Sequence, residues 1–308
     1  MAKGEVSIII PTYNEKENLE KLIPNIEKVL SSNSLIGEII LIDDNSPDGT
    51  GKYAESLNSK YKNIRVVHRD KREGVGSARK LGFSLASKDI IISIEGDNTH
   101  NPEYIPQFVK KINEGADLVI GSRYLNESKI INWPLKRRVI SKVANFVSRF
   151  LAGAKLTDVT NGYRAFTKKL FGKLTIESSS YPYNMEFACE AWSRGFKIVE
   201  IPIIFMDREK GKSKLSVWKE FLLFVRVAFR FSYTYRPIRV FGSLGILFMV
   251  IGLVLAIHLM VIKLATGFIG NRLPSMIFSL VLIISGIQIF SLGLIADVLS
   301  KLRKEMLR

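Results

Sequence analysis

Cysteine, histidine and acidic residues are scarce in this sequence. Among 308 residues there is one cysteine, Cys189, so no disulfide can form within the chain, which is typical of a reducing compartment. The three histidines belong to no evident Ser-His-Asp set that would indicate nucleophilic catalysis. Lysine and arginine outnumber aspartate and glutamate by 45 to 29, a net charge of +16. This excess favours an anionic partner, meaning nucleic acid, an acidic membrane surface or a phosphorylated substrate.

Three familiar sequence patterns are also missing. The glycine fingerprint GxGxxG does not follow the first apolar run, and its nearest match, Gly74-Val-Gly76, follows the third, which argues against a nicotinamide dehydrogenase. The N-terminus, MAKGEVSIIIPTYNE, predicts no signal peptide, because its apolar run is short and a turn follows at once. No nucleic-acid-binding motif is present, so we expect no nucleic-acid partner despite the positive charge.

Two long uncharged segments lie near the C-terminus. Residues 241–262 and 273–296 contain no Asp, Glu, Lys or Arg. Each is long enough, at about 1.5 Å per residue, to cross a hydrocarbon core of roughly 30 Å, so together they predict a transmembrane hairpin. A pair of buried helices in a soluble fold is the alternative, but helices this long and apolar on every side are uncommon there.

The charges that flank these segments predict their orientation. Arg236 and Arg239 precede the first segment and KLRKEMLR follows the second, whereas the connecting loop carries only Lys263 and Arg272. The positive-inside rule therefore places both termini in the cytoplasm, as expected for a multi-pass protein of the cell membrane.

The sequence predicts four parts. Residues 1–215 form a cytoplasmic domain. Residues 216–239 mix Trp, Phe and Tyr with Lys and Arg, which favours an amphipathic helix at the surface of the lipid bilayer, or alternatively a helix packed on the soluble domain. Residues 240–298 hold the two transmembrane helices, and residues 299–308 form a basic cytoplasmic tail.

The first part alternates short apolar runs with amphipathic segments. This alternation indicates an α/β fold with a mostly parallel, Rossmann-like sheet. The loops after the apolar runs are polar, and ligands of such sheets bind at the carboxyl ends of the strands. Strands are predicted at 6–10, 38–42, 64–68, 89–94 and 117–121, and helices around 16–31, 51–60, 76–87 and 103–113.

Six segments of this part together resemble one family. Their order and spacing are similar to those of the polyprenyl-phosphate sugar synthases of glycosyltransferase family 2, such as dolichyl-phosphate mannose synthase and the prenyl-phosphate glucosyltransferases. The resemblance covers about the first 215 residues and implies a GT-A fold. The segments are PTYNE (11–15), DDNSPDGT (43–50), GSRY (121–124), PLKRRVIS (134–141), TDVTNGYRAF (157–166) and REKGKSKL (208–215).

The resemblance implies a role for individual residues. Acceptor phosphate would be bound by Arg123, Arg137 and Ser141, although Arg138 could replace Arg137 if the register is shifted by one. The catalytic set would be Asp97, Arg123 and Arg208. For Asp43 and Asp48 the alternative to a binding role is that they only shape a turn, because SPDG is a favoured turn sequence. The nucleotide sugar would be bound by Pro11, Tyr13, Glu15, Ile42, Asp44, Gly96, Asp97, Arg208 and Lys214.

The segment IEGDNTH departs from the family pattern. The family has Asp-x-Asp followed by Gln, whereas this chain has Glu95, Asp97 and, at the glutamine position, Thr99. Glutamate is still a hard oxygen ligand, so the resemblance implies that these three residues bind Mg²⁺ or Mn²⁺. Because glutamate is longer than aspartate and threonine lacks the amide of glutamine, a weakened metal site or an ordinary acidic turn is also possible here.

We expect inverting transfer of a hexose from GDP-mannose or UDP-glucose to a polyprenyl or dolichyl phosphate. A membrane-tethered nucleotide-sugar-binding protein with a degenerate metal site is the alternative. A processive polysaccharide synthase is disfavoured, because neither Gln107 nor Gln288 begins the Gln-x-x-Arg-Trp motif of those enzymes. Whether the chain forms a homo-oligomer is left open.

Overall fold

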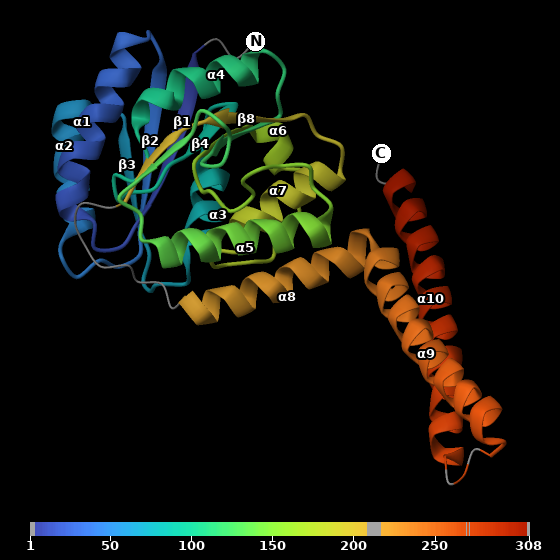
Figure 1. Cartoon of the computed structure of the whole chain (residues 1–308). Helices are drawn as coiled ribbons and strands as arrows, with labels where there is room; N and C mark the ends of the chain where they lie inside the picture. Colours follow the sequence, from blue (N-terminus) through green and yellow to red (C-terminus); the bar gives the residue numbers. More distant parts are fainter. Residues whose placement is uncertain (1–3, 208–216, 269, 271, 307–308) are drawn as a thin grey trace. The chain divides into compact units, whose positions relative to one another are not determined.

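The computed structural model describes residues 4–207, 217–268, 270 and 272–306. The chain divides into two compact units, Met1–Phe150 with Ala154–Val227, and Leu151–Gly153 with Ala228–Arg308. Helix α8 (Val217–Tyr235) runs across the boundary between them. Figure 1 shows the course of the chain.

The first unit is built on a seven-stranded sheet with strand order β3-β2-β1-β4-β7-β5-β8. The apolar strands in its interior are buried on both faces, as is typical of parallel sheets covered by helices, whereas the two edge strands are partly exposed. All five predicted strands are confirmed, each to within two residues. The strands are β1 (Glu5–Thr12), β2 (Ile36–Asp43), β3 (Ile64–His68), β4 (Ile90–Ser93), β5 (Leu118–Ser122), β7 (Arg164–Thr167) and β8 (Ile198–Pro202).

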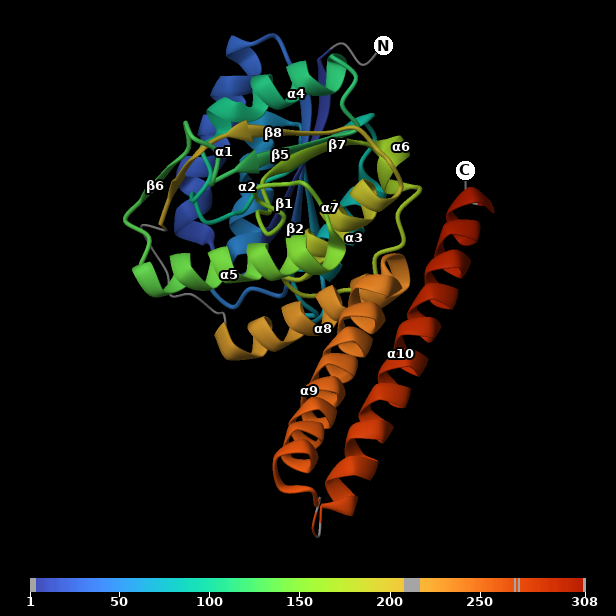
Figure 2. The same ribbon diagram turned by 45° about the vertical axis from the view of Figure 1, so that its right-hand side comes forward.

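Alternate residues of the strands face two helical layers. Ile8 of β1 belongs to the core cluster that also contains apolar residues of α1 and α4, whereas Ile9 faces Gly82 of α3 on the other side. Figures 1 and 2 show α1 and α4 on one side of the sheet and α3 and α7 on the other. The helices of this unit are α1 (Lys16–Ser32), α2 (Thr50–Tyr61), α3 (Val75–Leu85), α4 (Ile105–Asn113), α5 (Leu135–Ala152), α6 (Lys168–Phe171) and α7 (Tyr183–Ser193), with a 3₁₀ turn, η1 (Pro102–Tyr104).

The strands after β5 were not predicted from the sequence, and of these β7 matters most for the site. It lies antiparallel between β4 and β5, with Arg164 opposite Ser93 on one side and Ile120 on the other. Because it runs backwards, the beginning of β7 lies at the same edge as the carboxyl ends of its neighbours. The segment TDVTNGYRAF therefore joins the polar loops at that edge. A second, two-stranded sheet pairs β6 (Lys129–Ile131) with β9 (Ile204–Met206).

The second unit contains two long antiparallel helices, shown side by side in Figure 2. After a π-helical turn, η2 (Ile238–Gly242), α9 runs from Ser243 to Thr266 and α10 from Leu273 to Met306. Residues 238–266 and 273–302 are long and apolar enough to cross a membrane by length and composition. Helix α10 thus continues into the segment that the sequence predicted as a tail.

Glycines allow these two helices to approach closely. A Cβ atom on Gly245 would lie 2.6 Å from the carbonyl oxygen of Gly286, and one on Gly252 would lie 2.8 Å from that of Ser279. Small residues at helix contacts are typical of membrane proteins, where close van der Waals packing holds helices together.

Candidate functional site

A pocket of about 550 Å³, including space open to solvent, lies at the carboxyl edge of the sheet. The register places its walls together, because Thr12 at the end of β1 pairs with Asp43 at the end of β2, and Ile9 pairs with Ser93 at the end of β4. Six of the predicted nucleotide-sugar residues line it, namely Pro11, Tyr13, Glu15, Asp44, Gly96 and Asp97. Thr12, Arg72, Val75, Glu95 and Tyr181 complete the lining.

The aspartates after β2 have different roles. Asp43 accepts hydrogen bonds from the backbone and hydroxyl of Ser46, and Asp48 accepts them from Thr50, so both shape the turn. Asp44 instead lines the pocket and forms an ion pair of 2.7 Å with Arg69. Burial raises the pKa of Asp44 above its ordinary value and outweighs the opposing effect of the Arg69 charge.

Aromatic rings bound the pocket. The guanidinium of Arg72 lies 4.6 Å from the ring centre of Tyr13, a cation–π contact. Tyr181 belongs to a loop that α7 fixes, because Glu186 accepts hydrogen bonds from the backbone N–H groups of Glu177 and Ser178. These rings supply flat apolar surface of the kind that base and sugar rings stack on.

Asp97 lies on a tight turn after β4. Asn98 adopts a left-handed conformation with φ of 58°, which asparagine tolerates, and its side chain donates to the carbonyl of Asn18. The backbone N–H and the hydroxyl of Thr99 both donate to Oδ1 of Asp97, at 3.2 and 2.7 Å. The carboxylate is therefore oriented by its own turn and also lines the pocket, so the acidic-turn and ligand-binding interpretations are compatible.

Glu95 has a strong partner in this structure. One of its oxygens accepts a hydrogen bond from the guanidinium of the buried Arg79. Among the described residues, no group of three or more His, Cys, Asp or Glu side chains is arranged to hold a metal ion. Asp97, the hydroxyl of Thr99 and a substrate phosphate would nevertheless supply hard oxygen donors of the kind that Mg²⁺ and Mn²⁺ prefer, so the residues fit such a cation.

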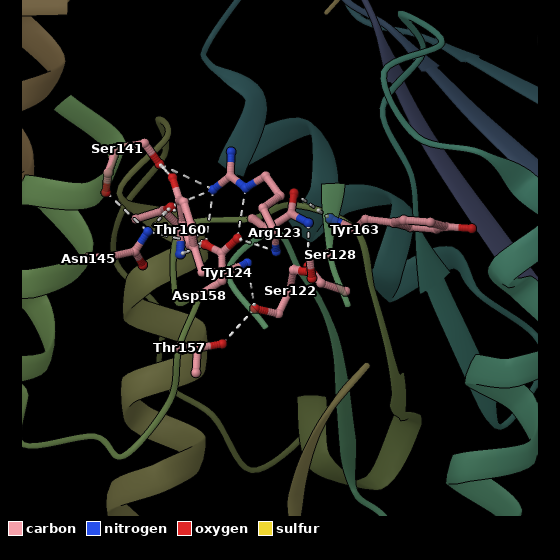
Figure 3. A network of polar contacts seen from close by, with 12 residues as sticks. Ser122, Arg123, Tyr124, Ser128, Ser141, Asn145, Thr157, Asp158, Thr160 and Tyr163 are labelled. Atoms are coloured by element: carbon pink, nitrogen blue, oxygen red, sulfur yellow. Dashed lines mark hydrogen bonds and ion pairs between the residues drawn. The ribbon is translucent and has the colours of Figure 1, made fainter. Parts of the chain in front are cut away.

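Arg123 is the centre of a second polar cluster, shown in Figure 3. Its Nε donates to Asp158 Oδ2 at 2.7 Å and its Nη2 to Asp158 Oδ1 at 3.0 Å, a bidentate pair. Asn145 and Thr160 also donate to this carboxylate. Rings of Tyr124, Trp133 and Phe205 lie 5.5, 5.1 and 5.4 Å from the guanidinium. The arginine is thus fixed by a carboxylate on one side and by aromatic rings around it.

Burial and ion pairing have opposite effects on the pKa values of Arg123 and Asp158. Burial alone would raise the pKa of Asp158, but the charge and hydrogen bonds of Arg123 outweigh it and hold the pKa below the ordinary value. Burial would likewise lower the pKa of Arg123, and the Asp158 carboxylate reverses that effect, so the pKa of Arg123 is raised. Both groups are therefore charged at neutral pH.

The structure places the other predicted acceptor residues around Arg123 or one helical turn away. The Ser141 hydroxyl lies 3.4 Å from Arg123 Nη2 and accepts a hydrogen bond of 2.8 Å from Tyr124. Arg137 lies one turn earlier on α5 and approaches Asp207 at 3.7 Å.

Three of the predicted nucleotide-sugar residues are not part of the pocket lining. One of them is buried elsewhere, and two lie outside the residues that the structure describes. Ile42 is fully buried in β2 against α3 and is absent from the pocket lining. Arg208 and Lys214 lie outside the described residues.

His100 lies between the pocket and the Arg123 cluster. It packs against Phe205, which also contacts Arg123, and its Nε2 lies 3.0 Å from Asn161 Oδ1. Burial lowers the pKa of His100, although the carboxylates of Glu95 and Asp97 act in the opposite direction. A neutral, buried imidazole suits a structural role that joins the two sites.

Helix α5 carries an exposed apolar stripe. Its residues are spaced four, four, three and four apart, so they share one face of the helix. The helix contains no acidic residue and carries Lys136, Arg137, Arg138, Lys142 and Arg149. The members of this α5 stripe, with exposed fractions of 42–74%, are Leu135, Val139, Val143, Phe146 and Phe150.

Two important residues were missed by the sequence reasoning. Arg79 lies four residues before the buried Phe83, so both are on the same face of the helix. A charged residue on the buried face of a helix is unusual, and this could have indicated that Arg79 has a buried partner. Asp158 lies within TDVTNGYRAF, a segment noted for resemblance without a role for its aspartate. Nothing in the local sequence shows that it meets Arg123, 35 residues away.

Known proteins resemble this chain in sequence and in fold. The family model described as Glycosyl transferase family 2 matches residues 7–175, and the model described as GtrB C-terminal hairpin matches residues 236–302. Among solved structures, glucosyl-3-phosphoglycerate synthase from Mycobacterium tuberculosis, in complex with Mn²⁺, UDP and glucosyl-3-phosphoglycerate, is similar in fold. Its TM-score is 0.57 at 20% identity, with 74% of this chain and 79% of that chain covered.

Curated relatives are closer in sequence. Polyprenol monophosphomannose synthase of Mycolicibacterium smegmatis is 37% identical over 216 residues, covering 68% of this chain and 80% of that protein. Dolichol-phosphate mannosyltransferase of Pyrococcus furiosus is 39% identical over 214 residues, covering 68% of this chain and 59% of that protein. The resemblance seen in the sequence is thereby confirmed. The chain belongs to glycosyl transferase family 2 and is a glycosyltransferase with a GT-A fold.

Proposed function

We propose that the protein transfers a hexose from a nucleotide sugar to a polyprenyl phosphate, with inversion at the anomeric carbon. The observation that carries the proposal is the meeting of two sites at one sheet edge. A carboxylate-lined pocket suits the donor, and the cluster of Arg123 and Ser141 suits an acceptor phosphate. His100 and Phe205 join the two. Relatives named polyprenol- and dolichol-phosphate mannosyltransferases support this substrate class.

The reaction needs no strong general base. A phosphate monoester has a second pKa of about 6, so most of the acceptor is already a dianion at neutral pH. One of its oxygens attacks the anomeric carbon, the bond from that carbon to the donor diphosphate breaks, and the nucleoside diphosphate leaves with the electron pair. Positioning and charge compensation then supply most of the catalysis.

The charge of the pocket explains why a cation belongs to the proposal. Glu15, Asp44, Glu95 and Asp97 line it with Arg72 as the one basic lining residue of the described chain. A diphosphate would be repelled unless positive charge lay between it and the carboxylates. Mg²⁺ or Mn²⁺ would supply that charge and polarise the leaving diphosphate. Asp97, with Thr99 orienting it, is the proposed ligand, and Arg208 and Lys214 remain proposed contacts of the diphosphate.

The acceptor phosphate would bind where Arg123 is already fixed. Arg123 has two of its three nitrogens committed to Asp158, so the third, Nη1, is the donor proposed for phosphate. Ser141 and Arg137 would add a hydroxyl and a second positive charge. The α5 stripe, with its flanking basic residues, suits the surface of an anionic bilayer in which the lipid tail of the acceptor lies.

The donor is proposed to be GDP-mannose, with UDP-glucose as the second candidate. The mannosyltransferase names of the relatives favour mannose. A nucleotide-sugar-binding protein without turnover is the alternative from a different class. We further propose a multi-pass protein of the cell membrane, with the catalytic domain and both termini in the cytoplasm, on the basis of the two apolar helices and the flanking charges.

A transfer assay tests this function. Purified full-length protein in detergent is incubated with polyprenyl phosphate, a labelled nucleotide sugar and Mg²⁺, Mn²⁺ or EDTA, and the lipid is extracted. We expect label in the lipid with GDP-mannose and its loss with EDTA. Measurable binding of the nucleotide sugar without lipid label from any donor would support the non-catalytic alternative.

Changing the α5 stripe should affect the acceptor alone. Phe146→Glu places a negative charge on the apolar face, so we expect the KM for polyprenyl phosphate in vesicles to rise at least about tenfold, because an anionic side chain there opposes burial of that face in an anionic bilayer. The KM for the nucleotide sugar should not change. Glu127→Gln, on a neighbouring loop, is the control. Equal changes in both KM values would contradict a membrane-facing role.

A further inference from the structure

The carboxylate of Glu200 lies behind the polar cluster of Arg123. Glu200 is in the middle of β8, where it pairs with Ile120 of β5. Its oxygens accept three hydrogen bonds from the segment before β7. The donors are the backbone N–H of Thr157 at 2.8 Å, the Thr157 hydroxyl at 2.8 Å and the backbone N–H of Asp158 at 2.9 Å. Glu200 has no basic partner in the part of the chain that the structure describes, so its contacts are concentrated on this one segment.

Two hydroxyl groups extend the contacts of Glu200 to β5. The hydroxyl oxygens of Thr157 and Ser122 lie 2.6 Å apart, as Figure 3 shows. Thr157 donates its only hydroxyl hydrogen to the Glu200 carboxylate, which is an acceptor, so Ser122 must be the donor to Thr157. The Ser122 oxygen in turn accepts a hydrogen bond of 3.3 Å from the backbone N–H of Tyr124. A continuous chain of hydrogen bonds therefore runs from Tyr124 to Glu200.

This chain holds Arg123 from two directions. It includes both chain neighbours of Arg123, and it also fixes the backbone of Asp158, which forms the bidentate pair with the guanidinium. The segment that carries Asp158 has no regular secondary structure, so its position depends on such contacts. Asn145 of α5 holds the next residue by accepting from the N–H of Val159, and Glu200 is the anchor on the side of the sheet. Hydrogen bonds in one chain strengthen each other, so loss of the final acceptor should loosen the whole chain.

We propose that Glu200 is a positioning residue for the acceptor phosphate. It holds the segment of Thr157 and Asp158 so that Asp158 fixes two nitrogens of Arg123 and leaves Nη1 for the phosphate. The inference rests on the proposed function, since it takes Arg123 as the residue that binds the acceptor. Glu200 is absent from the lining of the donor pocket, so its effect should fall on the acceptor and not on the nucleotide sugar.

Steady-state kinetics with both substrates tests the positioning role. Glu200→Ala removes the acceptor of three hydrogen bonds, and a shift of about 1 Å in a positioning group can cost about 100-fold in rate. We expect the KM for polyprenyl phosphate to rise at least about tenfold and the KM for the nucleotide sugar to stay within about twofold. An unchanged KM for polyprenyl phosphate, or an equal rise in both KM values, would overturn the proposal.

Glu38 provides a matched control. Its carboxylate also accepts three hydrogen bonds, from the hydroxyls of Ser7 and Ser87 and from the backbone N–H of Ser87. It lies near the amino ends of β1 and β2, away from the polar loops. Glu38→Ala should therefore leave both KM values within about twofold. A rise in the KM for polyprenyl phosphate as large as that of Glu200→Ala would show a general effect of lost stability and would refute the positioning role.

Two milder variants separate positioning from charge. Thr157→Val keeps the Glu200 charge but removes the hydroxyl that joins Ser122 to Glu200, so the KM for polyprenyl phosphate should rise at least about threefold. Glu200→Gln keeps one oxygen acceptor and should give an effect smaller than that of Glu200→Ala, which it replaces if Glu200→Ala does not fold. If Glu200→Gln raises this KM and Thr157→Val does not, Glu200 acts through its charge and the proposal fails.

Binding of a short prenyl phosphate does not depend on turnover. Farnesyl phosphate is titrated into the full-length protein in detergent, and the dissociation constant is measured by calorimetry. We expect Glu200→Ala to raise this constant at least about tenfold and Glu38→Ala to leave it within about twofold. If no donor sugar reaches lipid while this contrast is found, the proposed function fails and the positioning role stands. If transfer occurs but Glu200→Ala binds farnesyl phosphate as tightly as the wild type, the function stands and the inference fails. Absence of binding by the wild type would also overturn the inference.

Discussion

Replacing Asp97 by asparagine is expected to lower kcat/KM for sugar transfer by about 10²–10³-fold, the loss typical when charge stabilisation of a leaving group is removed. The substitution conserves shape, and an amide oxygen can still accept the hydrogen bonds that Thr99 donates. The turn should therefore remain folded while the negative charge that faces the pocket is lost. The measurement is the rate of lipid labelling over a range of donor concentrations.

A carboxylate at the opposite edge of the sheet provides the control for this prediction. Asp117 precedes β5 and accepts a hydrogen bond from the backbone of Lys197, far along the strand from the polar loops. Asp117→Asn should leave kcat/KM within about twofold, as is usual for surface substitutions. Activity of Asp97→Asn close to that of the wild type would show that this carboxylate takes no part in the reaction.

Breaking the Arg123–Asp158 pair should cost stability as well as activity. Asp158→Asn leaves a buried arginine without its counter-charge, and removing one partner of a buried pair typically costs about 3–5 kcal/mol. For a domain of this size that corresponds to a fall of roughly 10 °C in the midpoint of thermal unfolding. The midpoint is measured on the detergent-solubilised full chain at pH 7.

The same pair predicts a pH dependence with a definite sign. The pKa of Asp158 in the folded protein lies below its ordinary value. Its contribution to stability is therefore present above the unfolded pKa of about 4 and is lost as the pH falls through the folded value. The difference between wild type and Asp158→Asn in the midpoint of thermal unfolding should be largest near pH 7 and should become smaller below about pH 4.

An exposed ion pair serves as the comparison. Lys111 and Glu114 lie 2.8 Å apart with side chains 34% and 46% exposed. Glu114→Gln should leave the midpoint of thermal unfolding nearly unchanged, because solvent screens such pairs. A constant difference between wild type and Asp158→Asn from pH 7 to pH 3 would argue that the buried pair contributes through packing and not through charge.

Local sequence patterns were sufficient for the parts of the fold that depend on local physics. The apolar runs that became β1, β2, β4 and β5 are visible because strands buried on both faces must be apolar throughout, whereas the edge strand β3 was found from its short β-branched run. The polar loops after these runs were correctly predicted to meet at one edge, since parallel strands share that edge. The two long apolar helices were equally easy to predict, because length and the absence of charge decide whether a helix can cross a membrane.

The pairing of β7 with β4 and β5 could not be predicted from local patterns. Its four residues, Arg164–Thr167, contain one arginine and one threonine and are too short for a periodicity. Only the hydrogen bonds to two neighbours already in the sheet make it a strand, and its antiparallel direction is what brings Asp158 and Gly162 to the site.

The sequence by itself determined the class of fold, the family resemblance and most of the pocket lining, since these follow from residues that are close together in the chain. The tertiary structure decided which charges meet. Asp158 pairs with Arg123, and Arg79 pairs with Glu95, across separations that no spacing rule covers. The physical reason is that burial makes an unpaired charge costly, so a buried charge needs a partner, and which side chains are buried together is a property of the packed sheet and helices and not of the local sequence.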